Sequence, residues 1–306
     1  MWPSRRTVVE RIDQHLIHFA DNVRPLPGIA DAAARNTLTM QMVASLRRLD
    51  YTRKVMGRGI SPLRADPTSF LFDPERAAMF HAKAGNLDEA FWLVFLSIHF
   101  GKHPGHGWRR VQDVYSGLGE GFWTWQRVSA APKEFRDWLR RNEGRIGGAF
   151  GNHRKYESIK ADSPNGTAVV VESYVTWVGN AGSHQNLVAD LVRRVGNDPH
   201  RIFQEFYDAM GVERFGRLGK FDFLALVGRL GLAPIEPGIA YLQGATGPLR
   251  GARLLFGGAC DAGLDTSTLE EWLCALDAGL QIGMQAMEDS LCNWQKSPSV
   301  FVHFKG

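Results

Sequence analysis

The stretch YLQGATGPLRGARLLF, at residues 241–256, decides the fold that we expect for this chain. Apolar side chains recur at three- and four-residue steps over residues 221–230, just before it, and predict a helix there. Two prolines then end that helix, and Gly244 with Gly247 predicts a tight turn. Gly251 opens a second predicted helix with small side chains, as a close contact between two helices requires. A glycine turn that enters a helix leaves backbone N–H groups available to bind a phosphate.

Two arginines, Arg250 and Arg253, add positive charge to the start of the second helix. Together with the glycine turn, they resemble the helix-hairpin-helix clamp for the DNA backbone, which reads L-x-G-x-G-P-x-x-A in DNA glycosylases. This turn has one residue more than that pattern. Leu249 or Arg250 also stands where bifunctional glycosylases carry a catalytic lysine, so the resemblance implies no Schiff-base lyase chemistry. The DNA contacts expected from the clamp are Gly244, Gly247, Arg250, Gly251 and Arg253.

Three further segments extend the resemblance: FGNHRKYES at residues 150–158, FGRLGKFDF at 215–223 and EDSLCNWQKSP at 288–298. With the clamp, they resemble the alpha-glutamyl/putrescinyl thymine pyrophosphorylase family, clade 3, over most of the chain after about residue 51. The resemblance implies a fold related to the helix-hairpin-helix DNA glycosylases. It also implies an association with the hypermodified bases of phage DNA, whose substituents such proteins install or whose bases they remove.

Composition sets wide limits on function. Lys and Arg number 36 against 32 Asp and Glu, and the net charge of +4 suits nucleic acid without requiring it. The three cysteines lack a C-x-x-C pair, so neither a disulfide framework nor an iron–sulfur cluster is expected. No apolar run reaches the ~20 residues of a membrane span, and the N-terminal residues lack a signal-peptide core. We expect a cytoplasmic protein whose partner is DNA, with no membrane contact and no obligate protein partner.

The helical periodicity of the chain predicts an all-α fold. Residues 1–50 are expected to form an N-terminal helical segment with a turn at 25–28, and residues 51–306 a helix-hairpin-helix glycosylase-like domain. That domain would have two helical lobes around a cleft for DNA and the base. Residues 51–76 are expected to be irregular, because glycines and prolines are frequent there.

Three further helices follow from local signals. Asn86 is a good N-cap for an apolar core helix that ends at Gly101. The β-rich residues 167–177 fit either a strand or a helix, and we favour a helix. A long apolar repeat predicts one continuous helix over residues 269–291, with its start signal at Thr268.

Chemistry on a base in duplex DNA requires the nucleotide to be extruded into a pocket, with a carboxylate near the sugar. In helix-hairpin-helix glycosylases an aspartate follows the hairpin, and Asp261 and Asp265 are the acids in that position here. Without a catalytic role, Asp261 would be an ordinary exposed loop acid and Asp265 a helix cap. Glu288 is the third catalytic candidate, because it falls at the border of an apolar helix face, where desolvation would raise its pKa. Asp289 falls opposite that face and is expected to be exposed.

The segment at residues 152–156 places an amide, an imidazole, two cations and a phenol after a glycine break. We expect it to contact a phosphate or the modified base. Arg154 and Lys155 would bind phosphate, whereas hydrogen bonds would come from Asn152 and His153 and stacking from Tyr156. A plain basic loop is the alternative. Asn293 and Lys296 are assigned to the same pocket because they lie in a matched segment.

A basic turn follows the core helix, and its residues Lys102, His103 and Arg109 are expected to contact DNA, with Arg110 beside them. Three histidines at positions 99, 103 and 106 have a spacing that could serve zinc. Gly101 ends the helix between them, and no carboxylate or cysteine completes a site. We therefore expect neither a metal nor another cofactor.

Two enzymatic functions fit these features. The leading hypothesis is a monofunctional DNA glycosylase that hydrolyses the N-glycosidic bond of a bulky base, such as glucosylated hydroxymethylcytosine in phage DNA, and leaves an abasic site. The alternative is a transferase that displaces pyrophosphate from an activated hydroxymethylpyrimidine with an amino acid or a polyamine. Its pyrophosphate site would use Arg154, Lys155 and the basic loop at residues 53–64. A third hypothesis is a catalytically inactive DNA-binding module or defence sensor.

Overall fold

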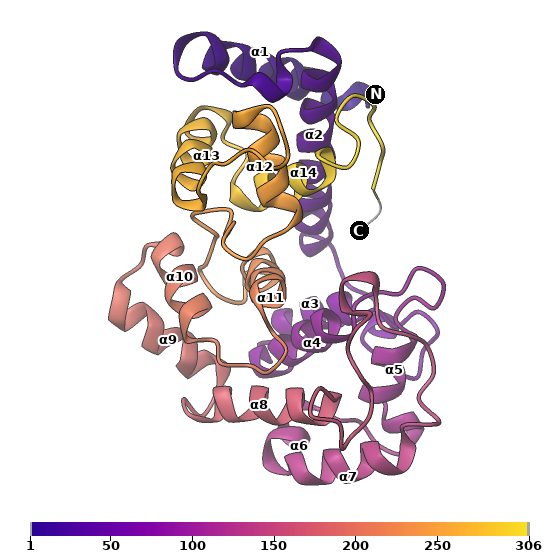
Figure 1. Cartoon of the computed structure of the whole chain (residues 1–306). Helices are drawn as coiled ribbons and strands as arrows, with labels where there is room; N and C mark the ends of the chain where they lie inside the picture. The colour runs from indigo at the N-terminus through magenta and orange to yellow at the C-terminus, as the bar shows by residue number, and fades with distance from the viewer. Residues whose placement is uncertain (1, 305–306) are drawn as a thin grey trace. The chain divides into compact units, whose positions relative to one another are not determined.

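The structure, a computed structural model, describes residues 2–304 and is all-α in that part (Figure 1). Fourteen α-helices and five short 3-10 helices account for its regular elements, and the described residues contain no strand beyond two isolated β-bridges. The expected fold class is therefore confirmed. By their contacts, Met1–Arg53 and Pro237–Gly306 form one compact unit, unit 1, and Lys54–Glu236 forms a second, unit 2.

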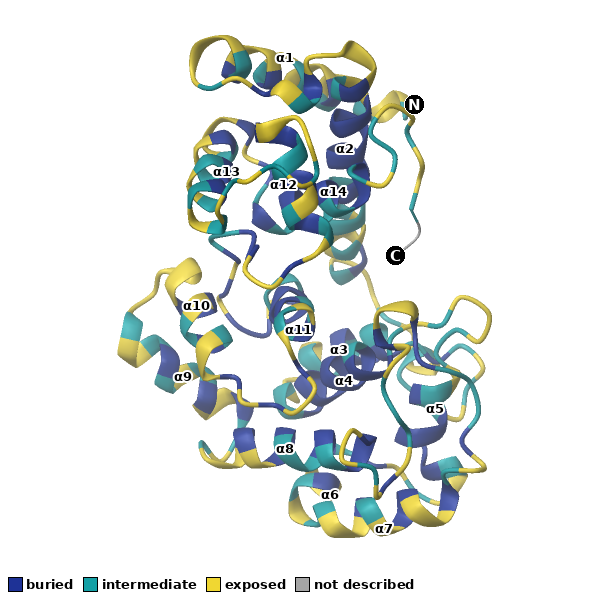
Figure 2. Cartoon of the chain, in the orientation of Figure 1, coloured by how far each residue is buried: buried dark blue, intermediate teal, exposed yellow. Residues whose placement is uncertain are grey.

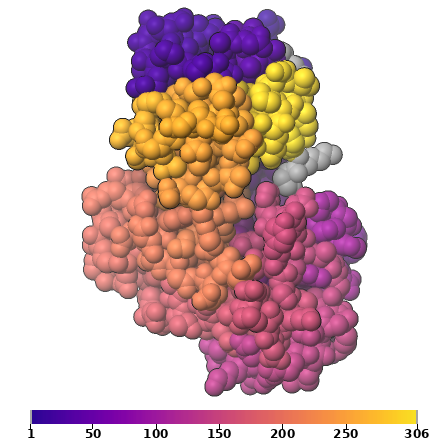
Figure 3. Space-filling view, in the orientation of Figure 1, coloured from indigo at the N-terminus to yellow at the C-terminus, as the bar shows by residue number. Residues whose placement is uncertain are grey.

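Unit 1 joins the two ends of the chain around one apolar core. Its elements are η1 (Pro3–Arg5), α1 (Arg6–Asn22), η2 (Pro27–Ile29), α2 (Ala32–Met56, whose last residues belong to unit 2), α12 (Gly247–Gly257), α13 (Thr266–Leu280) and α14 (Met284–Trp294). Leu16 and Leu38 are fully buried in the same cluster as Leu255, Leu273 and Met287. In Figure 3 the indigo surface of the N-terminal residues borders the orange surface of the C-terminal helices. The N-terminal segment thus shares its core with residues 237–306.

Unit 2 is built around α4. Its elements are η3 (Pro62–Arg64), α3 (Pro74–Lys83), α4 (Leu87–Phe100), α5 (Arg109–Tyr115), η4 (Gly117–Gly119), α6 (Trp125–Ala130), α7 (Pro132–Asn142), η5 (Asn152–Arg154), α8 (Thr167–Gly179), α9 (His184–Val195), α10 (Pro199–Ala209) and α11 (Arg217–Arg229). Figure 2 shows α4 buried along most of its length, as its run of apolar side chains requires. Asn86 Oδ1 accepts a hydrogen bond from the Glu89 backbone at 3.3 Å, and Gly101 (φ 65°) ends the helix, so both predicted boundaries are confirmed.

The β-rich residues 167–177 form helix α8, as we favoured. Val170, Val171 and Tyr174 are buried in unit 2. Burial of this apolar face outweighs the modest helix propensity of β-branched residues, because packing supplies most of the stability of a helix in a protein.

The expectation of an irregular stretch over residues 51–76 was wrong at both ends. Helix α2 continues to Met56. Pro74, which was taken as a helix breaker, occupies the first turn of α3, and Asp73 caps that helix by accepting a hydrogen bond from the Arg76 backbone at 3.1 Å. Proline is favoured in the first turn of a helix because backbone N–H groups there have no acceptor within the helix. A residue without an N–H therefore loses no hydrogen bond at that position.

The single helix predicted over residues 269–291 was also wrong. The chain forms α13 and α14 with a break between them, where Gln281 (φ 51°) adopts the left-handed conformation and Gly283 (φ 81°) also has a positive φ. Asp277 Oδ1 stabilises the break by accepting from the Ile282 and Gly283 backbones at 2.9 and 3.1 Å. Asp265, rather than Thr268, is the N-cap of α13.

No helix within residues 2–304 has the length and apolar character that a membrane span needs.

Candidate functional site

A cavity of about 540 Å³ lies in unit 2, between the loop that precedes α3, the turn that follows α4, and α5. Its lining combines cations, aromatic rings and a carboxylate. The lining residues are Arg64, Thr68, Phe70, Leu71, Phe72, Asp73, Lys102, His106, Gly107, Trp108, Arg109 and Gln112. The basic loop and the basic turn, which are far apart in the sequence, therefore meet at one site, and we refer to it as the cationic cavity.

The turn after α4 is held by its own hydrogen bonds. His103 and Gly107 exchange two backbone hydrogen bonds of 3.0 and 2.8 Å, and Gly107 adopts a φ of 55°. His103 Nδ1 accepts from the backbones of Gly105 and His106, at 3.1 Å each. The imidazole is therefore the tautomer that carries its proton on Nε2. These two hydrogen bonds to His103 fix the turn, and the turn places Lys102 and Trp108 in the cavity lining.

Three cations line the cavity, and carboxylates balance them only in part. Lys102 Nζ lies 5.7 Å from the centre of the Trp108 ring, in the range of a cation–π contact. Arg109 Nε is 2.9 Å from Asp113 Oδ1, and Asp113 also accepts from the Gly147 backbone at 2.8 Å. Arg64 Nη1 has a long contact of 3.5 Å to the Leu71 carbonyl. The lining thus keeps an excess of positive charge, which suits an anionic ligand.

Arg110, the neighbour of Arg109, has a structural role instead. Its Nε and Nη2 donate to the carbonyls of Gly147 and Gly148 at 3.2 and 2.6 Å. Its guanidinium also lies 4.8 Å from the centre of the Phe150 ring. These contacts direct Arg110 into unit 2, and it is absent from the cavity lining.

Two half-buried carboxylates in unit 2 have raised pKa values. Glu75 lies in the first turn of α3, where burial raises its pKa and the charges of Arg229 and Lys102 oppose that rise. Asp222 on α11 has its pKa raised by burial, against the opposing charges of His153 and its neighbouring arginines. Sequence reasoning missed both. Asp222 carried a usable signal, because it is an acid inside a run of buried apolar residues on its helix.

The 152–156 segment divides into one buried and four exposed residues. Arg154 is buried, and its Nε and Nη1 donate to the carbonyls of Ile98 and Arg214 at 3.0 and 3.2 Å. Burial lowers the pKa of its guanidinium. Gly219 allows this close packing, because a Cβ there would lie 2.4 Å from Arg154 Nη2. The exposed residues, which remain candidates for contact with DNA, are Asn152, His153, Lys155 and Tyr156.

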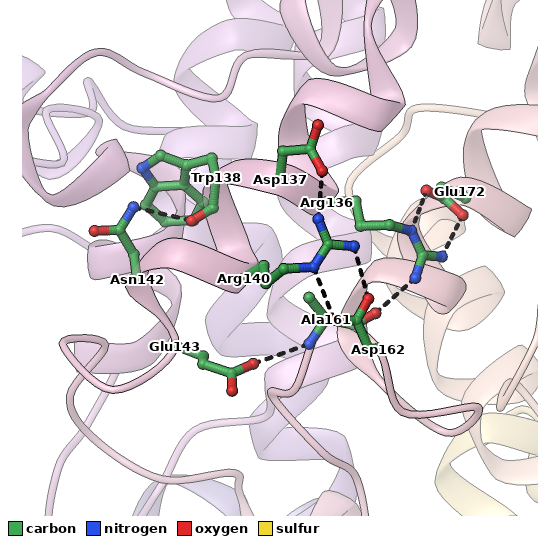
Figure 4. Close-up of polar contacts among 9 residues, drawn as sticks. All are labelled: Arg136, Asp137, Trp138, Arg140, Asn142, Glu143, Ala161, Asp162 and Glu172. Atoms are coloured by element: carbon green, nitrogen blue, oxygen red, sulfur yellow. Dashed lines mark hydrogen bonds and ion pairs between the residues drawn. The ribbon is translucent and has the colours of Figure 1, made fainter.

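Ion pairs anchor the chain that follows this segment (Figure 4). Arg136 binds both carboxylate oxygens of Glu172, at 2.7 and 2.5 Å, and also donates to the Ala161 carbonyl at 2.6 Å. Arg140 binds both oxygens of Asp162 at 2.7 Å. Helix α7 therefore holds residues 161 and 162 in place.

The predicted hairpin differs from a tight link between two helices. Helix α11 ends at Arg229 in unit 2, whereas α12 begins at Gly247 in unit 1, and residues 230–246 contain no helix. Gly251 is a contact glycine, as expected for a small residue between helices, but it lies inside α12 and does not open it. Gly247, which was expected in the turn, is the first residue of α12 and also a contact glycine. A Cβ at Gly247 would lie 2.6 Å from Cys292 Sγ, and one at Gly251 would lie 2.4 Å from the Leu291 carbonyl oxygen of α14.

The remaining clamp residues lie at the surface of unit 1. Gly244 has a φ of 73° and open space around it, as a turn glycine should. Arg250 is exposed, while Arg253 is half-buried and its Nε donates to the Leu264 carbonyl at 3.3 Å. A phosphate contact from Gly244 and Arg250 stays a prediction.

The three predicted catalytic acids have different environments within unit 1. Asp261 is an exposed loop residue. Asp265 is the exposed cap of α13, and hydrogen bonds from Ser267 and Thr268 hold its pKa far below the usual range. Glu288 is 8% exposed on α14, so its predicted position at the border of the core is confirmed. A catalytic role for any of the three stays a prediction.

Asp289, expected to be exposed, is instead half-buried and bonded. It accepts from Ser45 Oγ at 2.5 Å and pairs with Arg48 of α2. Contacts with Ser45 and Arg48 of α2 explain the difference, because periodicity along one helix does not show which other helix covers its polar face. Asn293 donates to Asp289 Oδ1, and Lys296 Nζ donates to Asn293 Oδ1, both at 3.0 Å.

Within residues 2–304, no three histidines, cysteines, aspartates or glutamates are grouped as metal ligands would be. His99 is buried beside Thr167, with Nε2 3.0 Å from its Oγ1. His103 and His106 stack on each other in the turn after α4, with ring centres 4.8 Å apart.

Comparison with known proteins gives one match. A family model described as alpha-glutamyl/putrescinyl thymine pyrophosphorylase clade 3 matches residues 33–306. No curated protein and no solved structure matched the chain. The matched range includes the cationic cavity, the 152–156 segment and helices α12 to α14. The chain therefore belongs to the alpha-glutamyl/putrescinyl thymine pyrophosphorylase family, clade 3.

Proposed function

We propose that the protein is a base-modifying transferase, which displaces pyrophosphate from an activated hydroxymethylpyrimidine in DNA with the amine of an amino acid or a polyamine. The family name pairs a glutamyl- or putrescinyl-bearing thymine with pyrophosphorylase chemistry, and this pairing supports transfer over hydrolysis of the glycosidic bond. The observation that carries the proposal is the cationic cavity of unit 2.

The cavity has the chemical groups that such a substrate needs. Pyrophosphate requires several cations, and Arg64, Lys102 and Arg109 provide them. An extruded pyrimidine requires aromatic or apolar walls, which Trp108 supplies. A volume of about 540 Å³ lies within the range of small-molecule sites. Asp73, the one acid among the described lining residues, suits the cationic end of an incoming polyamine.

The transfer step balances without a redox partner. The uncharged amine nitrogen attacks the exocyclic methylene carbon of the base and forms a C–N bond. The C–O bond to pyrophosphate breaks, and the electron pair leaves with the pyrophosphate, whose charge the cavity cations stabilise. The new ammonium group then loses a proton to a base. Glu75 is the candidate acceptor: it is not a lining residue itself, but it lies in the first turn of α3, two residues after the lining residue Asp73, and burial raises its pKa.

DNA would also contact exposed residues outside the cavity. Lys155 and Tyr156 of the 152–156 segment, and Arg250 at the start of α12, retain the backbone and stacking roles expected from sequence. Arg154 is buried, so Arg64 replaces it in the proposed pyrophosphate site.

The direct test uses DNA that carries pyrophosphorylated hydroxymethyluracil, with glutamate or putrescine as the amine. Pyrophosphate is measured in solution and the nucleosides are identified by mass spectrometry after digestion. We expect stoichiometric release of pyrophosphate and a nucleoside of the mass of the amine adduct. Lys102→Ala and Arg109→Ala should reduce both products together, because each removes a charge that stabilises the leaving group.

The same samples test the glycosylase hypothesis. Free base and abasic sites, without an amine adduct, would overturn transfer in favour of hydrolysis. In that case Glu288, the most buried of the three predicted catalytic acids, would be the first to replace. DNA with glucosylated hydroxymethylcytosine and unmodified DNA serve as parallel substrates for hydrolysis.

A further inference from the structure

We propose that Phe70 is a stacking platform for an unpaired nucleobase at the rim of the cationic cavity, so that the protein engages single-stranded or locally opened DNA there. The inference deepens the proposed function and rests on it for DNA as the partner. Phe70 lines the cavity, yet the residue is 91% exposed, the largest exposed fraction among the exposed large hydrophobic residues of the described chain. An exposed aromatic ring beside cations is a recurring feature of sites for single-stranded nucleic acid.

The loop that carries Phe70 is tightly held, so the exposure of this ring is built into the fold. Gln112 Nε2 on α5 donates to the carbonyls of Pro67 and Ser69, at 3.0 and 2.9 Å. On the other side of Phe70, the Phe72 backbone donates to the Ser69 carbonyl at 3.1 Å. A loop fixed on both sides of an exposed residue presents that residue in one place, which lowers the entropy lost on binding.

Neighbouring side chains secure the same loop. Asp66 Oδ1 accepts from both the backbone and the hydroxyl of Thr68, at 2.8 and 2.7 Å. Phe72 is 6% exposed, and its ring stacks on Tyr115 with ring centres 6.0 Å apart. Phe72 therefore anchors the loop in the core, whereas Phe70, two residues earlier, faces solvent. Exposure of an apolar ring to water is unfavourable, so a partner that covers the Phe70 ring would bind with a more favourable free energy.

The surroundings of Phe70 favour a nucleobase over an apolar protein surface. Arg64, Lys102 and Arg109 share the cavity with it, and this charge attracts a phosphate backbone. Trp108, also in the lining, offers a second ring face. Stacked bases bridged by phosphates match this alternation of rings and cations, whereas an apolar protein patch would leave the cations without partners.

The test measures binding of the full-length protein to a short single-stranded oligodeoxynucleotide that carries one 2-aminopurine. Fluorescence anisotropy gives the affinity, and 2-aminopurine emission reports stacking. Phe70→Ala should weaken binding about tenfold and remove the emission change, because one stacked base is lost. The salt dependence of binding should stay unchanged, since the phenyl ring carries no charge. Phe70→Trp should retain both signals.

Two further variants make the test specific. Lys102→Ala should weaken binding and lower the slope of log affinity against log salt by about one, unlike Phe70→Ala. Phe122→Ala is the matched control, because Phe122 is an exposed aromatic residue of unit 2 that is absent from the cavity lining. Equal affinity and equal 2-aminopurine emission for wild-type protein and Phe70→Ala would overturn the inference.

The assay also separates this inference from the proposed function. Stacking that depends on Phe70, with no release of pyrophosphate from the activated substrate, would leave the inference standing and overturn the transfer. Transfer that proceeds with the wild-type KM for DNA in Phe70→Ala would overturn the stacking role alone. A preference for duplex over single-stranded DNA that Phe70→Ala leaves unchanged would also contradict it.

Discussion

His184 Nδ1 lies 2.7 Å from Asp88 Oδ1, and its backbone N–H donates to the same oxygen at 2.8 Å. The carboxylate accepts from Nδ1, so in the neutral ring Nε2 is the acceptor for the Tyr174 hydroxyl, at 2.7 Å. The chain of hydrogen bonds links the first turns of α4 and α9 to α8, and it passes through an aromatic core that includes Phe91 and Trp125. Both His184 and Tyr174 are buried.

Tyr174→Phe should destabilise unit 2, because it leaves the buried His184 Nε2 without a donor. An unsatisfied buried polar atom costs about 1–3 kcal/mol, and the free energy of unfolding should fall by about that amount. Urea denaturation followed by tryptophan fluorescence measures it. Tyr156→Phe removes a hydroxyl from a residue that is 80% exposed and should change stability by less than about 0.5 kcal/mol. Equal losses in the two variants would contradict the role of the buried chain.

Stability should fall on acidification below neutral pH. Burial lowers the pKa of His184 and, more strongly, that of His99, so the unfolded chain binds protons that the folded chain excludes. Stability from these groups is fully present above their ordinary pKa of about 6.5 and is lost as pH falls toward their folded values. The Asp88 pKa is lowered by its bond to His184, and its contribution is lost only at more acidic pH.

Urea midpoints measured from pH 7.5 to pH 5 give the test, and they should decrease steadily over that range. The control is His106→Ala, because His106 is exposed. A midpoint independent of pH between 7.5 and 5 would contradict the expected loss of stability.

Gly251→Ala should separate α12 from α14. The added Cβ would lie 2.4 Å from the Leu291 carbonyl oxygen, a backbone atom that cannot turn aside as a side chain can. Overpacking of this kind costs about 1–3 kcal/mol, to be seen as a lower melting temperature by circular dichroism. Gly263→Ala is the matched control in unit 1, because nothing lies within 4 Å of the added Cβ. A neutral Gly251→Ala would mean that the two helices pack less closely than the structure shows.

Local signals predicted much of the fold. Asn86 and Gly101 bound α4 as expected, because N-caps and left-handed glycines act on their own backbone. The break between α13 and α14 escaped prediction because the apolar repeat continues through it, with Leu280 and Met284 both buried. Glutamine does not favour the left-handed conformation that Gln281 adopts, so its identity gave no sign of the break.

The cationic cavity was predicted only in part. Lys102 and Arg109 were expected to contact DNA, but nothing in their spacing placed Arg64 or Phe70 beside them. That proximity depends on tertiary contacts, among them the hydrogen bonds from Gln112 to the loop. Arg154 shows the opposite error. A charged residue in a basic segment was assigned to the surface, whereas carbonyl acceptors and Gly219 accommodate it in the interior.

Glu75→Gln should abolish most of the transfer while leaving DNA binding intact. A positioned proton acceptor contributes about 10²–10⁴-fold to a rate, so kcat should decrease by a factor in that range. The amide keeps the size of the side chain and removes its basicity. Anisotropy with the activated DNA measures binding, and pyrophosphate release measures kcat. Asp222→Asn is the matched control, because Asp222 is also a half-buried acid of unit 2 with a raised pKa.

The pH profile distinguishes a proton acceptor from a structural acid. Because burial raises the Glu75 pKa, the wild-type rate should begin to fall at a higher pH than an ordinary glutamate would give. This acidic limb of kcat should be absent in Glu75→Gln and present in Asp222→Asn. An acidic limb that persists in Glu75→Gln would assign the proton to another group, with Asp73 of the cavity lining as the next candidate. A loss of the limb in Asp222→Asn alone would transfer the role to α11.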